Sequence, residues 1–247
     1  GAALGAKGIG RVYGQARDFA AAVRKGDVQL AVVDSTYLAT IGGGYTVLAI
    51  GVRAGGTQAP WQIVSRTGAG RVLDLRGKTV LVPSIGGREA DFVLNAMFGG
   101  ELPRGFFARI DPAPDVLSAV TAVGLGKADV AVVPTGVELP SGVKPVATLV
   151  PVSWPVLVAY GSLPERQRGK VTAAATAFAG EEAITGFRAD DGEAVRRLAR
   201  RFTAPHRRGP MAIPNIRIAA GELIEGRRLA IGHADVRRFA VAPPSAQ

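Results

Sequence analysis

The sequence predicts an α/β protein of two lobes, each built on a mainly parallel sheet with flanking helices. Three observations lead to this prediction. A unit of helix, glycine, aspartate, apolar strand and polar loop occurs twice along the chain. The strands of these units are short and almost continuously apolar, which is typical of parallel strands covered on both faces. Further strand-like segments lie between and after the two copies, so the chain begins one lobe, inserts a second and then completes the first.

The first copy of the unit lies near the start of the chain. Apolar residues recur at helical spacing over residues 16–23, and Gly26 ends the predicted helix. Asp27 leads into the predicted strand 28–33, which ends at the polar run 34–37. In the second copy, the helical stripe covers 116–123, and glycines break it before the strand 130–133.

Strand-like segments at 45–52 and 61–66 connect the first copy to the inserted lobe. There the turn 74–78 feeds a strand at 79–82. A strand-like return runs over 146–160, and helices are predicted at 164–178 and 191–202. The first lobe is therefore assigned to residues 1–62 and 149–247, with a basic extension from about residue 203, and the second lobe to residues 63–148. Two or three crossover strands would form a hinge beside a cleft.

Composition fits a globular protein and argues against several functions. Of the 247 residues, 47% are hydrophobic and 20% are charged, and no apolar run reaches the roughly 18 residues of a membrane span. The start shows no signal-peptide pattern, so we expect that any export signal has been removed or never existed. Half of the net charge of +10 lies beyond residue 200, and no aromatic residues interleave with these arginines in a way that suggests base stacking. We therefore predict no nucleic-acid binding.

The inventory of catalytic groups is thin. The chain has no cysteine, and its two histidines, His206 and His233, lie in the basic tail without metal-ligand spacing. No nucleophile elbow, P-loop or paired carboxylates are visible. We therefore predict no enzymatic activity, no metal and no cofactor.

Several segments, in order, resemble type II periplasmic binding proteins, in the subgroup similar to the phosphate- and phosphonate-binding components of ABC transporters. The segments are 19–37 (FAAAVRKGDVQLAVVDSTY), 74–84 (DLRGKTVLVPS), 116–133 and the Leu-Pro-Glu at 163–165. The resemblance covers roughly residues 11–202. It implies two lobes that close on a solute, a monomer, and delivery of the solute to a membrane permease or another transport component. It also implies a periplasmic or otherwise extracytoplasmic location, free or anchored to the membrane.

Three departures from the family pattern matter. The family opens with a strand and a helix that we do not find before Arg11, and residues 203–247 match no part of it. Phosphonate binders of this subgroup carry a run of serines and threonines where this chain has Ser84-Ile85-Gly86-Gly87-Arg88. This last departure puts phosphonate itself in doubt.

Candidate ligand contacts follow from the rule that ligands bind outside the carboxyl ends of parallel strands. A glycine loop before a helix lets an anion approach the backbone, and the guanidinium of Arg88 suits a carboxylate or phosphate. Trp154, on the return crossover, could form the floor of the cleft. The same residues also fit turns, helix caps or ordinary packing. The predicted ligand-binding residues are Asp34, Ser35, Thr36, Tyr37, Ser84, Ile85, Gly86, Gly87, Arg88, Thr135, Gly136 and Trp154.

The leading hypothesis is a solute receptor for ABC-type transport with an oxyanion or carboxylate as ligand. The second is a lipid-binding transport protein, for a sterol-like molecule, because Ile85 and the glycines replace the hydroxyl cluster. A cavity of several hundred Å3 with an aliphatic and aromatic lining would favour the lipid. A third hypothesis is the ligand-sensing domain of a regulator.

Overall fold

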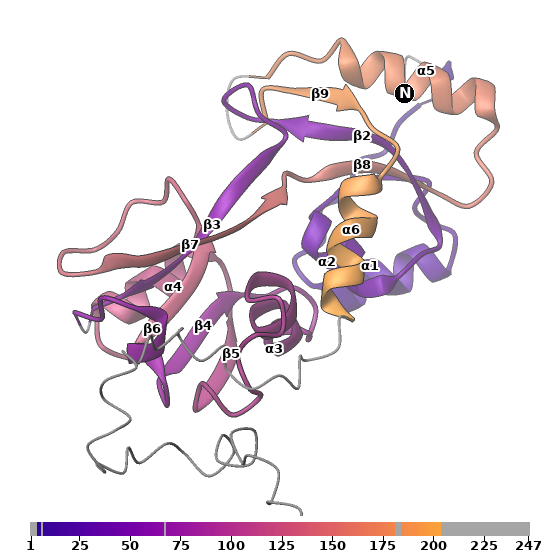
Figure 1. Cartoon of the computed structure of the whole chain (residues 1–247). Helices are drawn as coiled ribbons and strands as arrows, with labels where there is room; N and C mark the ends of the chain where they lie inside the picture. Colours follow the sequence, from indigo (N-terminus) through magenta and orange to yellow (C-terminus); the bar gives the residue numbers. More distant parts are fainter. Residues whose placement is uncertain (1–3, 6, 67, 181–183, 204–247) are drawn as a thin grey trace, which may run out of the picture. The chain divides into compact units, whose positions relative to one another are not determined.

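Two separate sheets organise the part of the chain that the structure, a computed structural model, describes: residues 4–5, 7–66, 68–180 and 184–203 (Figure 1). The helices and strands follow one another as α1 (Ala16–Arg24), β1 (Leu30–Val33), α2 (Ser35–Ile41), β2 (Tyr45–Val52), β3 (Gln58–Ser65), a 3-10 turn (Val72–Leu75), β4 (Thr79–Pro83), α3 (Glu89–Asp91), a π-helical segment (Phe92–Met97), β5 (Arg109–Ala113), α4 (Val116–Gly124), β6 (Val130–Pro134), β7 (Lys144–Ser153), β8 (Val156–Tyr160), α5 (Glu165–Thr176), β9 (Gly186–Ala189) and α6 (Glu193–Phe202).

The first lobe contains the sheet with strand order β1-β8-β2-β9. One face packs against α1, α2 and α6 through a core that includes Leu38, Val158 and Val195, and the other packs against α5 through Val171. Every described pairing in this sheet is antiparallel, so the prediction of a mainly parallel sheet is wrong for this lobe. The returning strand β8 inserts between β1 and β2, which run in the same direction. An apolar strand covered on both faces looks the same in sequence whichever way its neighbour runs.

The second lobe contains the sheet with strand order β5-β4-β6-β3-β7. The three strands β5, β4 and β6 are parallel, as predicted, while β3 and β7 are antiparallel to their neighbours. The helix α4 covers one face, and the side chain of Asp115 caps its start by accepting a 2.7 Å hydrogen bond from the Ser118 amide.

Two crossovers join the lobes. The chain passes from β2 to β3 through residues 53–57 and returns from β7 to β8 through residues 154–155. The amide of Trp154 donates to the carbonyl of Thr57 at 3.0 Å, and the amide of Gly51 donates to the carbonyl of Pro155 at 2.8 Å. The two crossovers therefore run beside each other as one connection. The changes of sheet fall at residues 53–57 and 154–155, whereas the boundaries assigned from the sequence, 62/63 and 148/149, lie inside β3 and β7.

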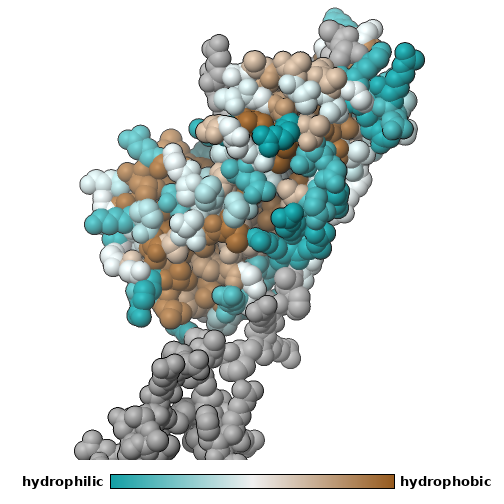
Figure 2. Space-filling model, turned by 45° about the horizontal axis from the view of Figure 1, so that its top comes forward, coloured by the Kyte–Doolittle hydropathy of each residue, from teal (hydrophilic) through white to brown (hydrophobic). Residues whose placement is uncertain are grey.

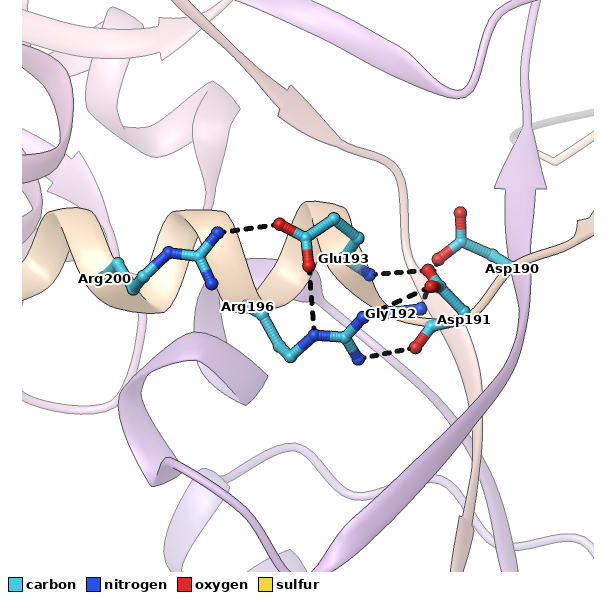
Figure 3. A network of polar contacts seen from close by, with 6 residues as sticks. All are labelled: Asp190, Asp191, Gly192, Glu193, Arg196 and Arg200. Atoms are coloured by element: carbon cyan, nitrogen blue, oxygen red, sulfur yellow. Dashed lines mark hydrogen bonds and ion pairs between the residues drawn. The ribbon is translucent and has the colours of Figure 1, made fainter.

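The helix α6 belongs to both cores. Its Val195 packs in the first lobe, whereas Phe202 is 1% exposed and packs in the core of the second lobe. Figure 3 shows how its start is fixed: Arg196 and Arg200 both bind Glu193, and Arg196 also reaches the preceding Asp191. These pairs are exposed and contribute little each to stability, but together they hold the first turn.

The surface is of mixed character. Figure 2 shows hydrophilic side chains gathered over the region of α5 and α6, both rich in arginine, and more hydrophobic ones on the second lobe. Among the described residues, no helix has both the length and the apolar run needed to cross a bilayer.

Candidate functional site: a cavity between the two lobes

A cavity of about 280 Å3 lies where the start of α2, the loop after β4 and the two crossovers meet. Both lobes contribute to its wall, which is mostly apolar. Its lining residues are Asp34, Ser35, Thr36, Arg53, Ala59, Trp61, Pro83, Ser84, Ile85, Val116, Pro134, Val152, Ser153, Trp154, Pro155 and Ile184. The carboxyl ends of β1, β4 and β6 thus converge on this space, as the strand-end rule predicts.

The start of α2 is fixed to the second sheet by a buried hydrogen bond. Ser35 is 2% exposed, and its hydroxyl donates to the carbonyl of Ser153 at the end of β7, over an O–O distance of 2.6 Å. This bond joins a helix of the first lobe to a strand of the second. Because the hydroxyl hydrogen of Ser35 is used in this bond, Ser35 contributes to the wall of the cavity but has no free hydrogen to donate to a ligand.

Asp34, the residue before α2, lies in the wall of the cavity. Its side chain makes no capping hydrogen bond to the helix, and the residue as a whole is exposed to solvent. Surrounding protein nevertheless desolvates the carboxylate, and this burial raises the pKa of Asp34 above its usual value.

The loop after β4 touches the opposite lobe. Gly86 has a φ of +99°, a region that glycine tolerates best, and a methyl group placed on it would lie only 3.1 Å from Cδ2 of Tyr37. The Tyr37 ring also packs edge to face against Phe19, with centroids 6.0 Å apart. Tyr37, in α2, and Ser84, after β4, both line a second, larger cavity that adjoins the first. The ends of β1 and β4 therefore face each other, as their place after two predicted strands suggests.

Three backbone amides of this loop are already engaged. The amide of Ser84 donates to the carbonyl of Ala113 at 2.8 Å. The amides of Ile85 and Gly87 both donate to Oε1 of Glu89, at 3.1 Å each. Glu89 is 7% exposed and is the first residue of α3. The position that the sequence suggests for a bound anion therefore holds a carboxylate of the chain itself.

Arg88 is also engaged within its own lobe and with α6. Its Nε and Nη2 donate to Oδ2 of Asp91 at 3.0 and 2.9 Å, and its guanidinium lies 5.4 Å from the ring centre of Phe202. Arg88 lines neither this cavity nor the larger cavity that adjoins it. The prediction that its guanidinium faces a ligand finds no support in this geometry.

The opposite end of the cavity carries an arginine and an indole. The guanidinium carbon of Arg53 lies 5.3 Å from the ring centre of Trp154, a cation–π geometry. Arg53 makes no ion pair within the described residues. The Nε1 atom of Trp154 is buried, and the described chain offers it no acceptor. A buried N–H without a partner costs about 1–3 kcal/mol.

A larger, more open cavity of about 1190 Å3 adjoins the first. The two share Asp34, Thr36, Ser84 and Ile85 in their walls. The larger one is lined mainly by α1, β1 and the segment before α1, and Tyr37 and Gly86 reach it from the α2 and β4 sides.

The predicted site residues divide into three groups. Asp34, Ser35, Thr36, Ser84, Ile85 and Trp154 line the small cavity, and Tyr37 and Gly86 line the large one. Gly87, Arg88, Thr135 and Gly136 line neither. Thr135 instead donates through both its amide and its hydroxyl to the carbonyl of Pro60, at 2.9 and 3.1 Å, and Gly136 sits in a turn with φ of +80°.

Sequence reasoning missed three residues of this site. Arg53 follows β2 at the first crossover and Trp61 lies in β3, and both line the cavity. Glu89 was missed as an acceptor, although an acidic residue at the start of a helix after a glycine loop is a capping signal.

Potential metal ligands do not cluster in the described part of the chain. No group of three or more histidine, aspartate or glutamate side chains is arranged there to hold a metal ion. The predictions that concern His206, His233 and the basic extension lie outside the described residues.

Comparison with known proteins is informative only for structure. No known family matches the sequence, and no curated protein is significantly similar to it. The solved structure of XAC2383 from Xanthomonas citri bound to ATP superposes with a TM-score of 0.64 at 15% identity, over 76% of this chain and 82% of the other.

Two further structures carry phosphonate in their descriptions. PhnD1 from Prochlorococcus marinus, in complex with methylphosphonate, has a TM-score of 0.58 at 10% identity, over 78% of this chain and 84% of the other. A binding protein component of an ABC phosphonate transporter from Pseudomonas aeruginosa has a TM-score of 0.55 at 15% identity, over 74% and 71%. The chain therefore has the two-lobed fold of type II solute-binding proteins, and the resemblance seen in the sequence is confirmed at the level of the fold.

Proposed function

We propose that the protein captures a small organic carboxylate with an apolar body in the cavity between its lobes, as the binding component of an ABC-type transport system. In this role it binds its ligand without catalysing a reaction, works as a monomer in an extracytoplasmic compartment, and delivers the ligand to a membrane permease. The observation that carries the proposal is the cavity itself, which both lobes enclose at the ends of their strands.

The chemistry of the wall supports this ligand class. Most of the lining is aliphatic or aromatic, which favours an apolar body. Arg53 and Trp154 offer a cation and an N–H donor at one end, where a single carboxylate could bind. The volume of about 280 Å3 lies just below the range of roughly 300–1,000 Å3 that drug-sized ligands occupy, so the ligand is small.

The crossovers supply the means of closure. The two connections at 53–57 and 154–155 run beside each other, and the cavity is bounded by both. Bending at so few residues changes the separation of the two walls without altering either sheet. Binding between the walls would then favour the closed arrangement.

A screen by thermal unfolding tests the proposal. Small carboxylates with apolar bodies should raise the melting temperature of the full chain, since a ligand at 100 times its Kd adds about 2.7 kcal/mol to stability. Their uncharged amides should raise it less. The matched variant is Arg53→Met, which keeps the stem over Trp154 but removes the cation. Carboxylates that stabilise Arg53→Met as well as the wild type would contradict the assignment of Arg53.

The larger cavity favours a lipid as the second candidate. Its volume of about 1190 Å3 could hold a sterol-sized molecule, and Ile9, Val12 and Phe19 are among its lining residues. The small cavity could not hold such a molecule. Extraction of the purified protein with organic solvent distinguishes the two candidates, because a retained lipid would place the ligand in the larger cavity.

A further inference from the structure

Glu89 is the one acidic residue that is buried in the described part of the chain, and it binds the loop that faces the other lobe. It is 7% exposed, and its Oε1 accepts hydrogen bonds from the amides of Ile85 and Gly87. A glycine-rich loop at the start of a helix is otherwise suited to an external anion, because its amides point outward and glycine lets the anion approach closely. Here the chain supplies that anion.

The neighbouring donors are occupied as well. The amide of Ser84 donates to Ala113, and the guanidinium of Arg88 is paired with Asp91. Ile85, which is 4% exposed, fills a further position in the wall with an aliphatic side chain. A tetrahedral oxyanion at this loop would therefore find few free donors and a buried carboxylate close by.

We propose that Glu89 is a specificity-determining residue, which fills the anion position of the loop 84–88 and so makes the cleft reject phosphonates and similar dianions. The inference rests on the proposed function and refines its ligand: the ligand presents an apolar or neutral group to this loop and any carboxylate to Arg53. Selection by built-in repulsion is a general route to specificity.

The test uses methylphosphonate as the probe, with the full chain, isothermal titration calorimetry, and the amide resonances of Ile85 and Gly87 in 15N-labelled protein. Glu89→Ala removes the carboxylate and frees both amides. We expect this variant to bind methylphosphonate at least tenfold more tightly than the wild type, with shifts at both amides. Glu101→Ala is the charge-matched control, since Glu101 is exposed and lies in the same lobe. It should bind as the wild type does.

A second variant keeps the test decisive if Glu89→Ala fails to fold. Glu89→Gln retains an oxygen that can accept from both amides but removes the negative charge. We expect it to bind methylphosphonate at least threefold more tightly than the wild type.

The inference is overturned if the wild type binds methylphosphonate as tightly as the folded variant does, or if neither shows any shift at Ile85 and Gly87. Either result leaves the capture of carboxylates untouched. Conversely, a failure of every carboxylate to bind would contradict the proposed function. The comparison between the wild type and Glu89→Ala would still show whether Glu89 prevents methylphosphonate from binding at the loop 84–88.

Discussion

The approach of Gly86 to Tyr37 provides a sharp test of how the two lobes face each other. In Gly86→Ala, the added methyl group would lie 3.1 Å from Cδ2 and 3.3 Å from Cε2 of the Tyr37 ring. Gly87 is a matched control, because its φ of +91° is close to the +99° of Gly86, yet a methyl group on Gly87 meets no atom within 4 Å. Both variants therefore share the backbone strain, and only one adds a contact across the cleft.

The expected losses follow from these geometries. Forcing alanine into the positive-φ region costs roughly 1–2 kcal/mol, and both variants bear this cost. Gly86→Ala should lose about 1 kcal/mol more, at the low end of the range for overpacking, because Tyr37 is only half-buried and its ring can move. The free energy of unfolding should therefore fall further in Gly86→Ala than in Gly87→Ala.

Urea unfolding followed by tryptophan fluorescence measures this difference. Repeating both substitutions in a Tyr37→Ala background removes the ring, and the additional loss at Gly86 should then vanish. Equal losses at Gly86 and Gly87, or an additional loss that persists without the ring, would refute a contact between the loop and α2.

Three further predictions concern the walls of the cavity. Ser35→Ala should lower the free energy of unfolding by about 1–2 kcal/mol because it leaves the Ser153 carbonyl without its donor, whereas Ser153→Ala keeps that carbonyl and should change little in the same urea assay. Trp154→Phe keeps an aromatic ring beside Arg53 but removes the buried N–H, so calorimetry should show about tenfold weaker binding of a carboxylate and no loss of stability. Burial raises the pKa of Asp34 above 3.8, so the folded state binds the carboxyl proton more tightly than the unfolded state does. Protonation of Asp34 therefore stabilises the fold at low pH, and this stabilisation is lost as the pH rises from 3.8 through the folded-state pKa. Asp34→Asn lacks that loss, so its advantage in urea midpoint over the wild type should grow from pH 3.5 to pH 7, and a constant difference would contradict the burial of Asp34.

Periodicity and turn residues were sufficient to predict most of the fold. The helices α1 and α4 lie where the apolar stripes place them, because each buries one face against a sheet, and α5 and α6 lie where helices were predicted. The strands β5 and β9 were missed. β5 contains Pro112 and two charged residues and lies at the edge of its sheet, where proline and charge are tolerated, so it lacks the apolar run of a central strand.

The candidate site could be predicted only in part, for a physical reason. The sequence shows which residues follow a strand, and the strand ends do converge on the cavity. It does not show which donors are already satisfied. Arg88, Thr135 and the amides of the glycine loop were predicted to bind a ligand, but in the structure their hydrogen bonds go to Asp91, Pro60 and Glu89.

The most direct test of the central claim, that the cavity between the lobes holds a small ligand, is native mass spectrometry of the gently purified full chain. A parallel sample carries Ala59→Phe, because Ala59 lines the small cavity, is 6% exposed, and a larger side chain would fill the space. We expect the wild type to release one small organic molecule and Ala59→Phe to release none. Equal retention of the same molecule by both proteins would contradict the account.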